Sequence, residues 1–188
     1  MLRTAGDIQS PAPCQRVEVM VREPLVAWAG DCLVKGTVEL GEGRLSDQVN
    51  TLDVVTFFGA TLEALDDGHA VVLDELEVDR GELHVIQVQG RRGDPERRLR
   101  TVEERVSVEL GPFVVTGNLH RPPNTAPLAA LTRWQRFVPM TDAVVGLREG
   151  EGIEVAQDVV LVNRERISRT VPLGWVPVMI EEGAPPPA

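Results

Sequence analysis

Two stretches of this 188-residue chain repeat the same order of strand-forming residues, and this repetition constrains the fold more than any other feature. The first, RLSDQVNTLDVVTFFGATL, covers residues 44–62, and the second, PLAALTRWQRFVPMTDAVV, covers residues 127–145. At a constant offset of 83, the apolar positions of one stretch coincide with those of the other. We therefore expect an internal duplication; the alternative is two unrelated β segments with similar alternation.

Matching strands flank both stretches. Upstream, VKGTVEL (34–40) corresponds to VTGNLHR (115–121), and each carries a glycine at the third position of an alternating strand. A glycine at such a position indicates a β-bulge or the close approach of a neighbouring backbone. Downstream, ELEVDRGELHVI (75–86) corresponds to VVLVNRERISRT (159–170), where Asp-Arg-Gly and Asn-Arg-Glu predict tight turns.

The composition favours sheet over helix. Valine occurs 29 times and tyrosine is absent, so the core must consist mostly of β-branched aliphatic side chains. Each copy has the pattern of five or six short antiparallel strands with one helical turn, which is too little for a sandwich but fits a small, strongly bent barrel. We predict an all-β, mainly antiparallel fold of two tandem small β-barrels, each with one short helical turn. Because so small a module is marginally stable alone, the copies should pack on one another or on another chain.

The sequence divides into five predicted segments. Proline, glycine and charge without periodicity mark both ends as loose tails, and a charged Gly/Pro-rich segment separates the two copies. The predicted boundaries are tails at 1–16 and 181–188, barrel repeats at 17–88 and 102–180, and an Arg-rich linker or hairpin at 89–101.

Charge and hydropathy exclude several classes of function. The net charge of −10 disfavours broad capture of nucleic acid or of an anionic membrane. The sequence has neither an apolar run of membrane-spanning length nor a secretory signal, so we expect a cytoplasmic protein without a membrane partner. Eighteen arginines against one lysine suggest a GC-rich bacterial genome. Cys14 and Cys32 are too few and too far apart to predict a disulfide framework or a zinc site, and two buried or free thiols are expected.

Catalytic motifs are absent from the sequence. His69, His84 and His120 form no metal-ligating pair, and no nucleophile elbow, P-loop or dinucleotide fingerprint is present. We predict no catalytic, metal or cofactor-binding residue and no enzymatic activity.

Apolar residues supply the candidate interface. Leu128, Leu131 and Trp134 recur at a spacing of three, typical of a short amphipathic helix that either packs on its own core or anchors a partner. The adjacent Phe57 and Phe58 lie on one predicted strand, where neighbouring side chains point to opposite faces. One of the two must therefore be covered outside its own barrel, which favours an interface between copies or chains.

Arginines are the candidates for contacts with phosphate or with an acidic partner. Between the copies, cations are concentrated at Arg91, Arg92, Arg97, Arg98 and Arg100. On one face they could contact phosphate, but no aromatic residue lies among them for base stacking. We favour a linker that makes ion pairs with the acidic segment 63–82, including that of a neighbouring subunit.

One family resemblance follows from these motifs. A Gly-bearing strand, the turn Asp47-Gln48-Val49-Asn50 and the segment Val-Asp-Arg-Gly-Glu-Leu (78–83) resemble the small five-stranded barrel of the Sm-like family. The resemblance implies barrels that join edge to edge into rings, and an RNA-contacting rim at Arg80, Gly81, Asp47 and Asn50. RLSDQVN and FVPMTDAVV are also similar to an uncharacterised bacterial domain with an RLSD-x-L-N turn and a strand ending in Thr-Asp-Ala.

These observations lead to two functional hypotheses from different classes. The first is a non-catalytic structural or protein-interaction module that acts by self-assembly, as a homo-oligomer, or as an adaptor for another protein. The alternative is Sm-like binding of RNA or single-stranded nucleic acid through Arg80 and the arginine-rich linker. No cofactor is expected in either case.

Overall fold

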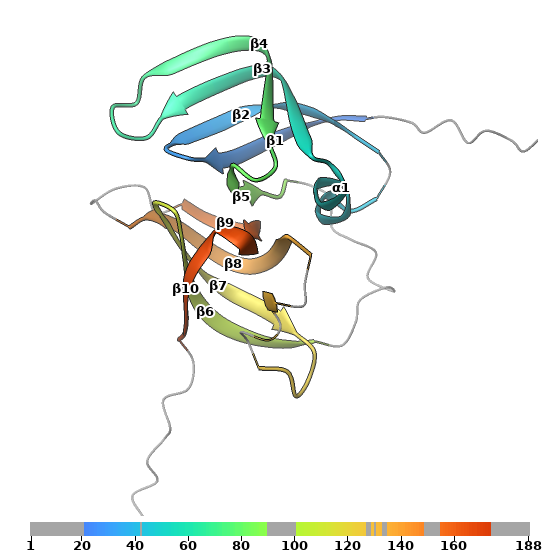
Figure 1. Ribbon diagram of the computed structural model, residues 1–188, viewed down its shortest axis with the longest axis vertical. Helices are drawn as coiled ribbons and strands as arrows, with labels where there is room; N and C mark the ends of the chain where they lie inside the picture. Colours follow the sequence, from blue (N-terminus) through green and yellow to red (C-terminus); the bar gives the residue numbers. More distant parts are fainter. Residues whose placement is uncertain are drawn as a thin grey trace, which may run out of the picture.

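Ten strands and one α-helix make up the described part of the chain, which we divide into a first half (21–89) and a second half (101–173) (Figure 1). The computed structural model describes residues 21–41, 43–89, 101–126, 129, 131–132, 135–148 and 155–173. The first half contains β1 (Val21–Ala29), β2 (Cys32–Leu40), α1 (Leu45–Thr51), β3 (Val54–Ala64), β4 (Ala70–Asp79) and β5 (Leu83–Gln87). The second half contains β6 (Val102–Leu110), β7 (Phe113–Arg121), β8 (Phe137–Leu147), β9 (Val155–Asn163), the 3-10 turn η2 (Arg164–Arg166) and β10 (Ile167–Pro172).

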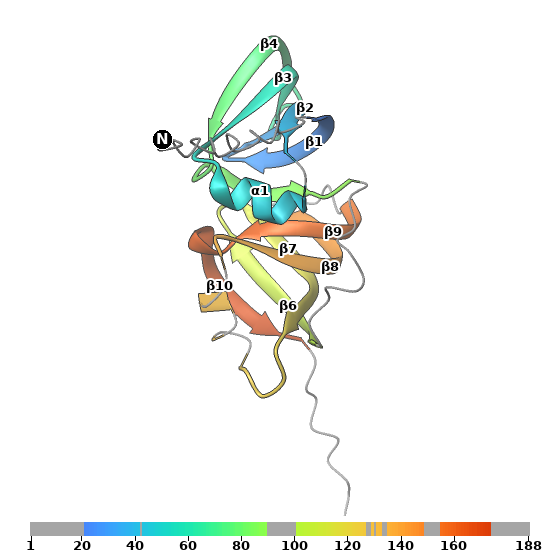
Figure 2. The same cartoon turned by 90° about the vertical axis from the view of Figure 1, so that its right-hand side faces the viewer.

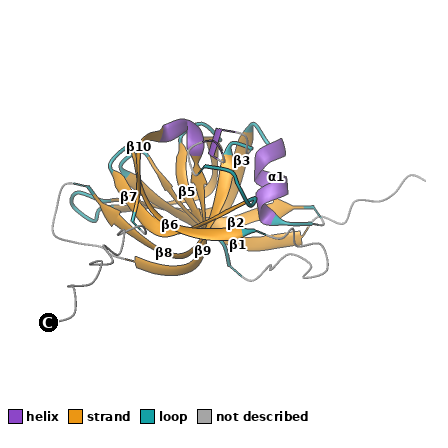
Figure 3. Ribbon diagram, turned by 90° about the horizontal axis from the view of Figure 1, so that it is seen from below, coloured by secondary structure: helices purple, strands orange, loops and turns teal. Residues whose placement is uncertain are grey.

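All ten strands belong to one antiparallel sheet with the order β10-β6-β7-β8-β9-β5-β1-β2-β3-β4. The predicted all-β, mainly antiparallel class is confirmed. Each half has the same internal order, in which its fifth strand pairs with its first and its fourth strand lies at the end. The strands are strongly twisted and bent (Figure 3), and β5 and β9 join the two halves in the middle (Figures 1 and 2).

We call two positions equivalent when they occupy the same place in the strand pairing of the two halves. Thr61 pairs with Lys35 in the first half, and Val144 pairs with Thr116 in the second. Positions of β3 and β8 offset by 83 are therefore equivalent, as the apolar pattern predicts. Among the described residues, the first strand runs from Val21 to Ala29.

A bulge interrupts the sheet at the same place in both halves. The register shifts between Lys35 and Thr37, and between Thr116 and Asn118. The intervening glycines, Gly36 and Gly117, leave little room for a side chain: a Cβ would lie 3.2 Å from the Phe58 carbonyl oxygen at Gly36 and 3.0 Å from the Thr141 carbonyl oxygen at Gly117. The close backbone approach expected from these glycines is present at both sites.

Opposite each bulge, the third strand of the half turns through a left-handed residue. Gly59 has φ +57° in β3, and the equivalent residue in β8, Asp142, has φ +46°. Asp142 is held there by hydrogen bonds from Arg105 Nη1 to its carbonyl oxygen (2.9 Å) and from Asn118 Nδ2 to its Oδ2 (3.1 Å). The same backbone shape is thus formed by glycine in one half and by a hydrogen-bonded aspartate in the other.

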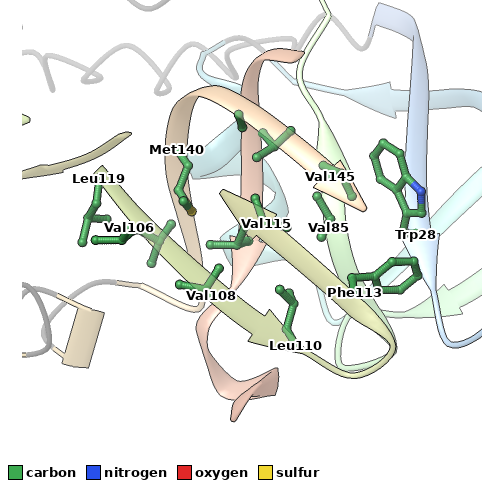
Figure 4. Close-up of a cluster of buried hydrophobic side chains, with 14 of the residues drawn as sticks. Trp28, Val85, Val106, Val108, Leu110, Phe113, Val115, Leu119, Met140 and Val145 are labelled. Atoms are coloured by element: carbon green, nitrogen blue, oxygen red, sulfur yellow. The ribbon is translucent and has the colours of Figure 1, made fainter. Parts of the chain in front are cut away.

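Two clusters of buried side chains fill the molecule, and each takes residues from both halves. The first core is formed mainly by β1, β2, α1 and β3, but it includes Phe137 and Leu161 from the second half. The second core is formed mainly by β6, β7 and β8, but it includes Trp28 and Val85 from the first half, as Figure 4 shows. Four buried residues therefore cross from one half into the core of the other.

Among the residues described, no helix has the length and apolar character required to cross a lipid bilayer.

Candidate interaction surfaces

The junction between β5 and β9, which we call the seam, shows how this sheet adds a strand at an edge. Val85 lies opposite Val162 and Ile86 opposite Leu161, and the Val88 N–H donates to the Val159 carbonyl at 3.1 Å. Both strands have hydrophobic side chains on both faces, and Ile86 and Val85 are fully buried. The seam is therefore a dry interface as well as a set of backbone hydrogen bonds.

A buried amide closes one end of the seam. Asn163 is completely buried and donates from Nδ2 to the Leu83 carbonyl oxygen at 2.8 Å. Its Oδ1 accepts from the Glu165 N–H at 3.1 Å, which fixes the start of η2. Both polar groups of the side chain are used: its NH2 group donates and its carbonyl oxygen accepts.

A second amide attaches α1 to the other half, between the two halves in Figure 2. Asn50 accepts from the Phe137 N–H at 2.9 Å through Oδ1 and donates from Nδ2 to the Phe137 carbonyl at 3.3 Å. The same Nδ2 lies 2.7 Å from the Ser46 carbonyl oxygen of α1. Asn50, which the Sm-like resemblance assigns to RNA contact, thus has a structural role in this chain.

His84 is a buried titratable group at the junction of the halves. Its Nδ1 accepts from the Gly30 N–H at 3.2 Å, and its ring packs edge-on against Phe113 of the second half at 5.6 Å. Burial, followed by the positive charge of Arg166, lowers the pKa of His84 below its usual value. The neutral imidazole is therefore the form that fits this position, although Glu82 acts in the opposite direction.

The outer edge of the first half is β4, which pairs only with β3 among the described strands. The Arg80 N–H donates to the Asp53 carbonyl at 2.9 Å, which sets the alternation of hydrogen bonds along the ladder. In an antiparallel pair, alternate residues direct their backbone groups to the neighbour and the others direct them away. The residues that direct theirs away from β3 are Glu75, Glu77 and Asp79, and all three are exposed. The Asp79 carbonyl already accepts from the Glu82 N–H at 2.9 Å in the turn that follows β4.

The outer edge of the second half is β10, which pairs only with β6 among the same strands. The Leu173 N–H donates to the Arg105 carbonyl at 2.8 Å, so Thr170 and Pro172 direct their backbone away from β6. Proline has no N–H, and the edge therefore lacks one donor. On the same strand, Arg169 makes an ion pair of 3.2 Å with Glu109.

The predicted interface residues lie in different environments. Phe57 is fully buried in the first core, and Phe58 is half-buried with the Arg22 guanidinium 4.5 Å from its ring centroid. Leu131 is buried in the second core at 6% exposure. Of the two phenylalanines, Phe58 is the one covered outside the core, by a cation within its own half. Leu128 and Trp134 lie outside the described residues.

Of the arginines predicted to contact phosphate or an acidic partner, Arg80 alone lies in the described part of the chain. Arg80 donates from Nη1 to the Asn50 carbonyl at 2.6 Å and from Nη2 to Asp53 Oδ1 at 3.1 Å, and its side chain is 17% exposed. Its Nε is buried without a partner. Arg80 therefore supports the end of α1 and presents little charge to solvent. The other candidates, Arg91, Arg92, Arg97, Arg98 and Arg100, lie outside the described residues.

Other groups with reactive side chains are dispersed. Within the described ranges, no three His, Cys, Asp or Glu side chains are grouped so that they could hold a metal ion. His120 lies 2.8 Å from Thr141 Oγ1 on the second half. Burial, followed by the hydrogen bond and charge of Asp31, raises the pKa of the Cys32 thiol, which disfavours the thiolate. Cys14 lies outside the described part of the chain.

Sequence reasoning named Asn50 and the turn at Asn163 but did not predict that their side chains connect the halves. Asn163 is equivalent to Asp79. The amide in place of a carboxylate at the aligned turns is the one feature of the sequence that could have indicated a different role for Asn163. The contact of Asn50 with Phe137 joins residues far apart in sequence, and no local pattern predicts it.

Comparison of the chain with protein-family models, with curated proteins and with solved structures gives no match. The function of these surfaces is therefore inferred from their geometry and charge.

Proposed function

We propose that this chain is a non-catalytic protein-interaction module that works by strand addition at the edges of its sheet. The observation that carries the proposal is the seam, where the fourth strand of the second half already accepts the fifth strand of the first. Among the described strands, the equivalents of these two, β4 and β10, lie at the two ends of the sheet, and each directs backbone groups away from its one neighbour. Unpaired strand edges are the usual sites of β-augmentation.

We also propose that the two halves are copies of one small, bent β-barrel. The common strand order, the bulges at Gly36 and Gly117 and the left-handed residues Gly59 and Asp142 support this origin. Each copy has two edge strands, its fourth and its fifth. Because β9 of the second half pairs with β5 of the first, the fourth strand of the first half (β4) and the fifth strand of the second half (β10) remain at the ends of the described sheet. Strand addition then has two modes: self-assembly with a second copy, or an adaptor role toward a strand of another protein.

The test measures whether the chain associates with itself or with a peptide, and which edge strand takes part. We expect either a concentration-dependent mass in sedimentation velocity or binding of extended peptides of about ten residues. In both cases hydrogen exchange should slow at the outward-facing amides of β4 or β10. A chain that stays monomeric at up to about 500 µM and binds no peptide of basic, acidic or neutral composition would refute the proposal.

The alternative function is Sm-like binding of RNA. It is supported by the sequence resemblance and by the arginines of the linker, whereas Arg80 has its Nη1 and Nη2 engaged with α1 and Asp53. A gel shift at about 50 mM salt that disappears when Arg97, Arg98 and Arg100 are changed to glutamate would favour it.

A further inference from the structure

We infer that β4 is the docking edge, and that it accepts an extended strand with basic side chains from a different protein. This inference rests on the proposed function and assigns it a site and a partner chemistry. A second copy of the chain is the competing occupant, and the experiment below separates the two.

The backbone of β4 has the geometry that strand addition requires. Glu75 and Glu77 direct their N–H and C=O groups away from β3, and Asp79 directs its N–H away, while the Asp79 carbonyl accepts from the Glu82 N–H at 2.9 Å. The equivalents of these three residues in β9 are Val159, Leu161 and Asn163. In the seam, this part of β9 is the part that pairs with β5. The same stretch of β4 is therefore ready to accept a strand in the same register.

The side chains of β4 select the charge of that strand. Carboxylates occupy Asp74, Glu75, Glu77 and Asp79, and all four are exposed. Opposite Glu75, Glu77 and Asp79 on β3 lie Phe58, Thr56 and Val54, none of which carries a positive charge. An incoming strand with lysine or arginine at alternate positions would supply the missing cross-strand partners, whereas an acidic strand would be repelled.

The β10 edge of a second copy fits β4 poorly. Pro172 is equivalent to Val88, the residue whose N–H donates across the seam, so β10 has no proton to offer the Glu75 carbonyl. Arg169 is equivalent to Val85, and its charge is already paired with Glu109. The apolar contact and one of the hydrogen bonds of the seam are therefore both absent from a β4–β10 junction.

The experiment uses the full chain and three labelled peptides of about ten residues in which valine alternates with lysine, glutamate or glutamine. In fluorescence anisotropy at low salt, we expect the lysine peptide to bind at least about tenfold more tightly than the glutamate peptide, and to weaken as salt is added. A lysine peptide N-methylated at alternate amides should lose about tenfold, because strand addition needs those N–H groups. Equal binding of lysine and glutamate peptides would overturn the inference.

Variants locate the site. Glu77→Lys should weaken the lysine peptide by about tenfold and improve binding of the glutamate peptide. Glu77→Pro removes an outward N–H without touching the ladder to β3, and should weaken all three peptides; circular dichroism checks that it folds. Glu103→Lys makes the same charge change on the second half and should have little effect.

Three further outcomes show whether β4 binds a strand of another protein, a second copy of the chain, or neither. Peptide affinity that falls equally in Glu103→Lys overturns the assignment to β4. A concentration-dependent mass that is lost in Glu77→Pro, without lysine-peptide binding, assigns β4 to a second copy; the inference then fails while the proposed function stands. Failure of all peptides together with a monomeric chain refutes both.

Discussion

The two halves share one backbone plan but differ in what they place at its edges, and this difference separates the seam from the outer surface. At four positions one half has a large apolar side chain buried in the core of the other half, and the equivalent residue is smaller or charged and at least partly exposed. The pairs are Phe137 and Val54, Leu161 and Glu77, Trp28 and Glu109, and Val85 and Arg169. Strand order alone therefore does not decide which edges join; a few side chains do.

The largest effect is expected from removing a side chain that one half contributes to the core of the other. Phe137→Ala should cost about 3–5 kcal/mol of unfolding free energy, because it empties part of the first core. The equivalent Val54 is 42% exposed, and Val54→Ala should cost less than about 1 kcal/mol. Urea denaturation of both variants measures the difference, and equal losses would contradict the crossed packing.

Exchanging the equivalent turn residues should have the next largest effect. Asn163→Asp removes the donor to the Leu83 carbonyl and buries a carboxylate, at a cost of about 2–4 kcal/mol at neutral pH. Asp79→Asn, the reverse change at an exposed position, should alter stability by less than about 0.5 kcal/mol. Denaturant midpoints give the comparison, and a tolerated Asn163→Asp would show that the amide is not needed.

The left-handed residues provide a smaller test. Gly59→Val should cost about 1–2 kcal/mol, since a β-branched residue is strained at φ +57° even though a Cβ there meets nothing within 4 Å. Asp142→Gly exchanges backbone strain for the hydrogen bond to Asn118 and should stay within about 1 kcal/mol. Thermal unfolding measures both, and a destabilised Asp142→Gly would show that its hydrogen bonds dominate.

The smallest effect concerns pH. Because the pKa of His84 is lowered in the folded chain, the unfolded chain takes up the proton first as pH falls. The stability that neutral His84 supplies is fully present above its unfolded pKa, near 6.5, and is lost as pH falls through the folded pKa. One proton limits the slope to about 1.4 kcal/mol per pH unit. His84→Gln should flatten the dependence of stability on pH below the unfolded pKa of histidine; an unchanged slope would assign the effect to other groups.

The local features of the fold could be predicted from the sequence, and the joining of the halves could not. The alternating valines and the glycines Gly36 and Gly117 indicate strands and bulges, because both signals act on neighbouring residues. The pairing of β5 with β9 depends on which edges meet in three dimensions. Among the candidate site residues, Phe57 and Arg80 were identified by type, but only the packing shows that one fills a core and the other supports α1.

The exchange of side chains between the cores has a consequence for any attempt to divide the molecule. A fragment ending near residue 89 would lack Phe137 and Leu161, and a fragment beginning near residue 101 would lack Trp28 and Val85. Each fragment would have a cavity in its hydrophobic core and would expose to water the edge strand, β5 or β9, that is buried in the intact chain. The separate pieces should therefore be poorly structured alone and should regain their structure when mixed, as two parts of one cooperative unit.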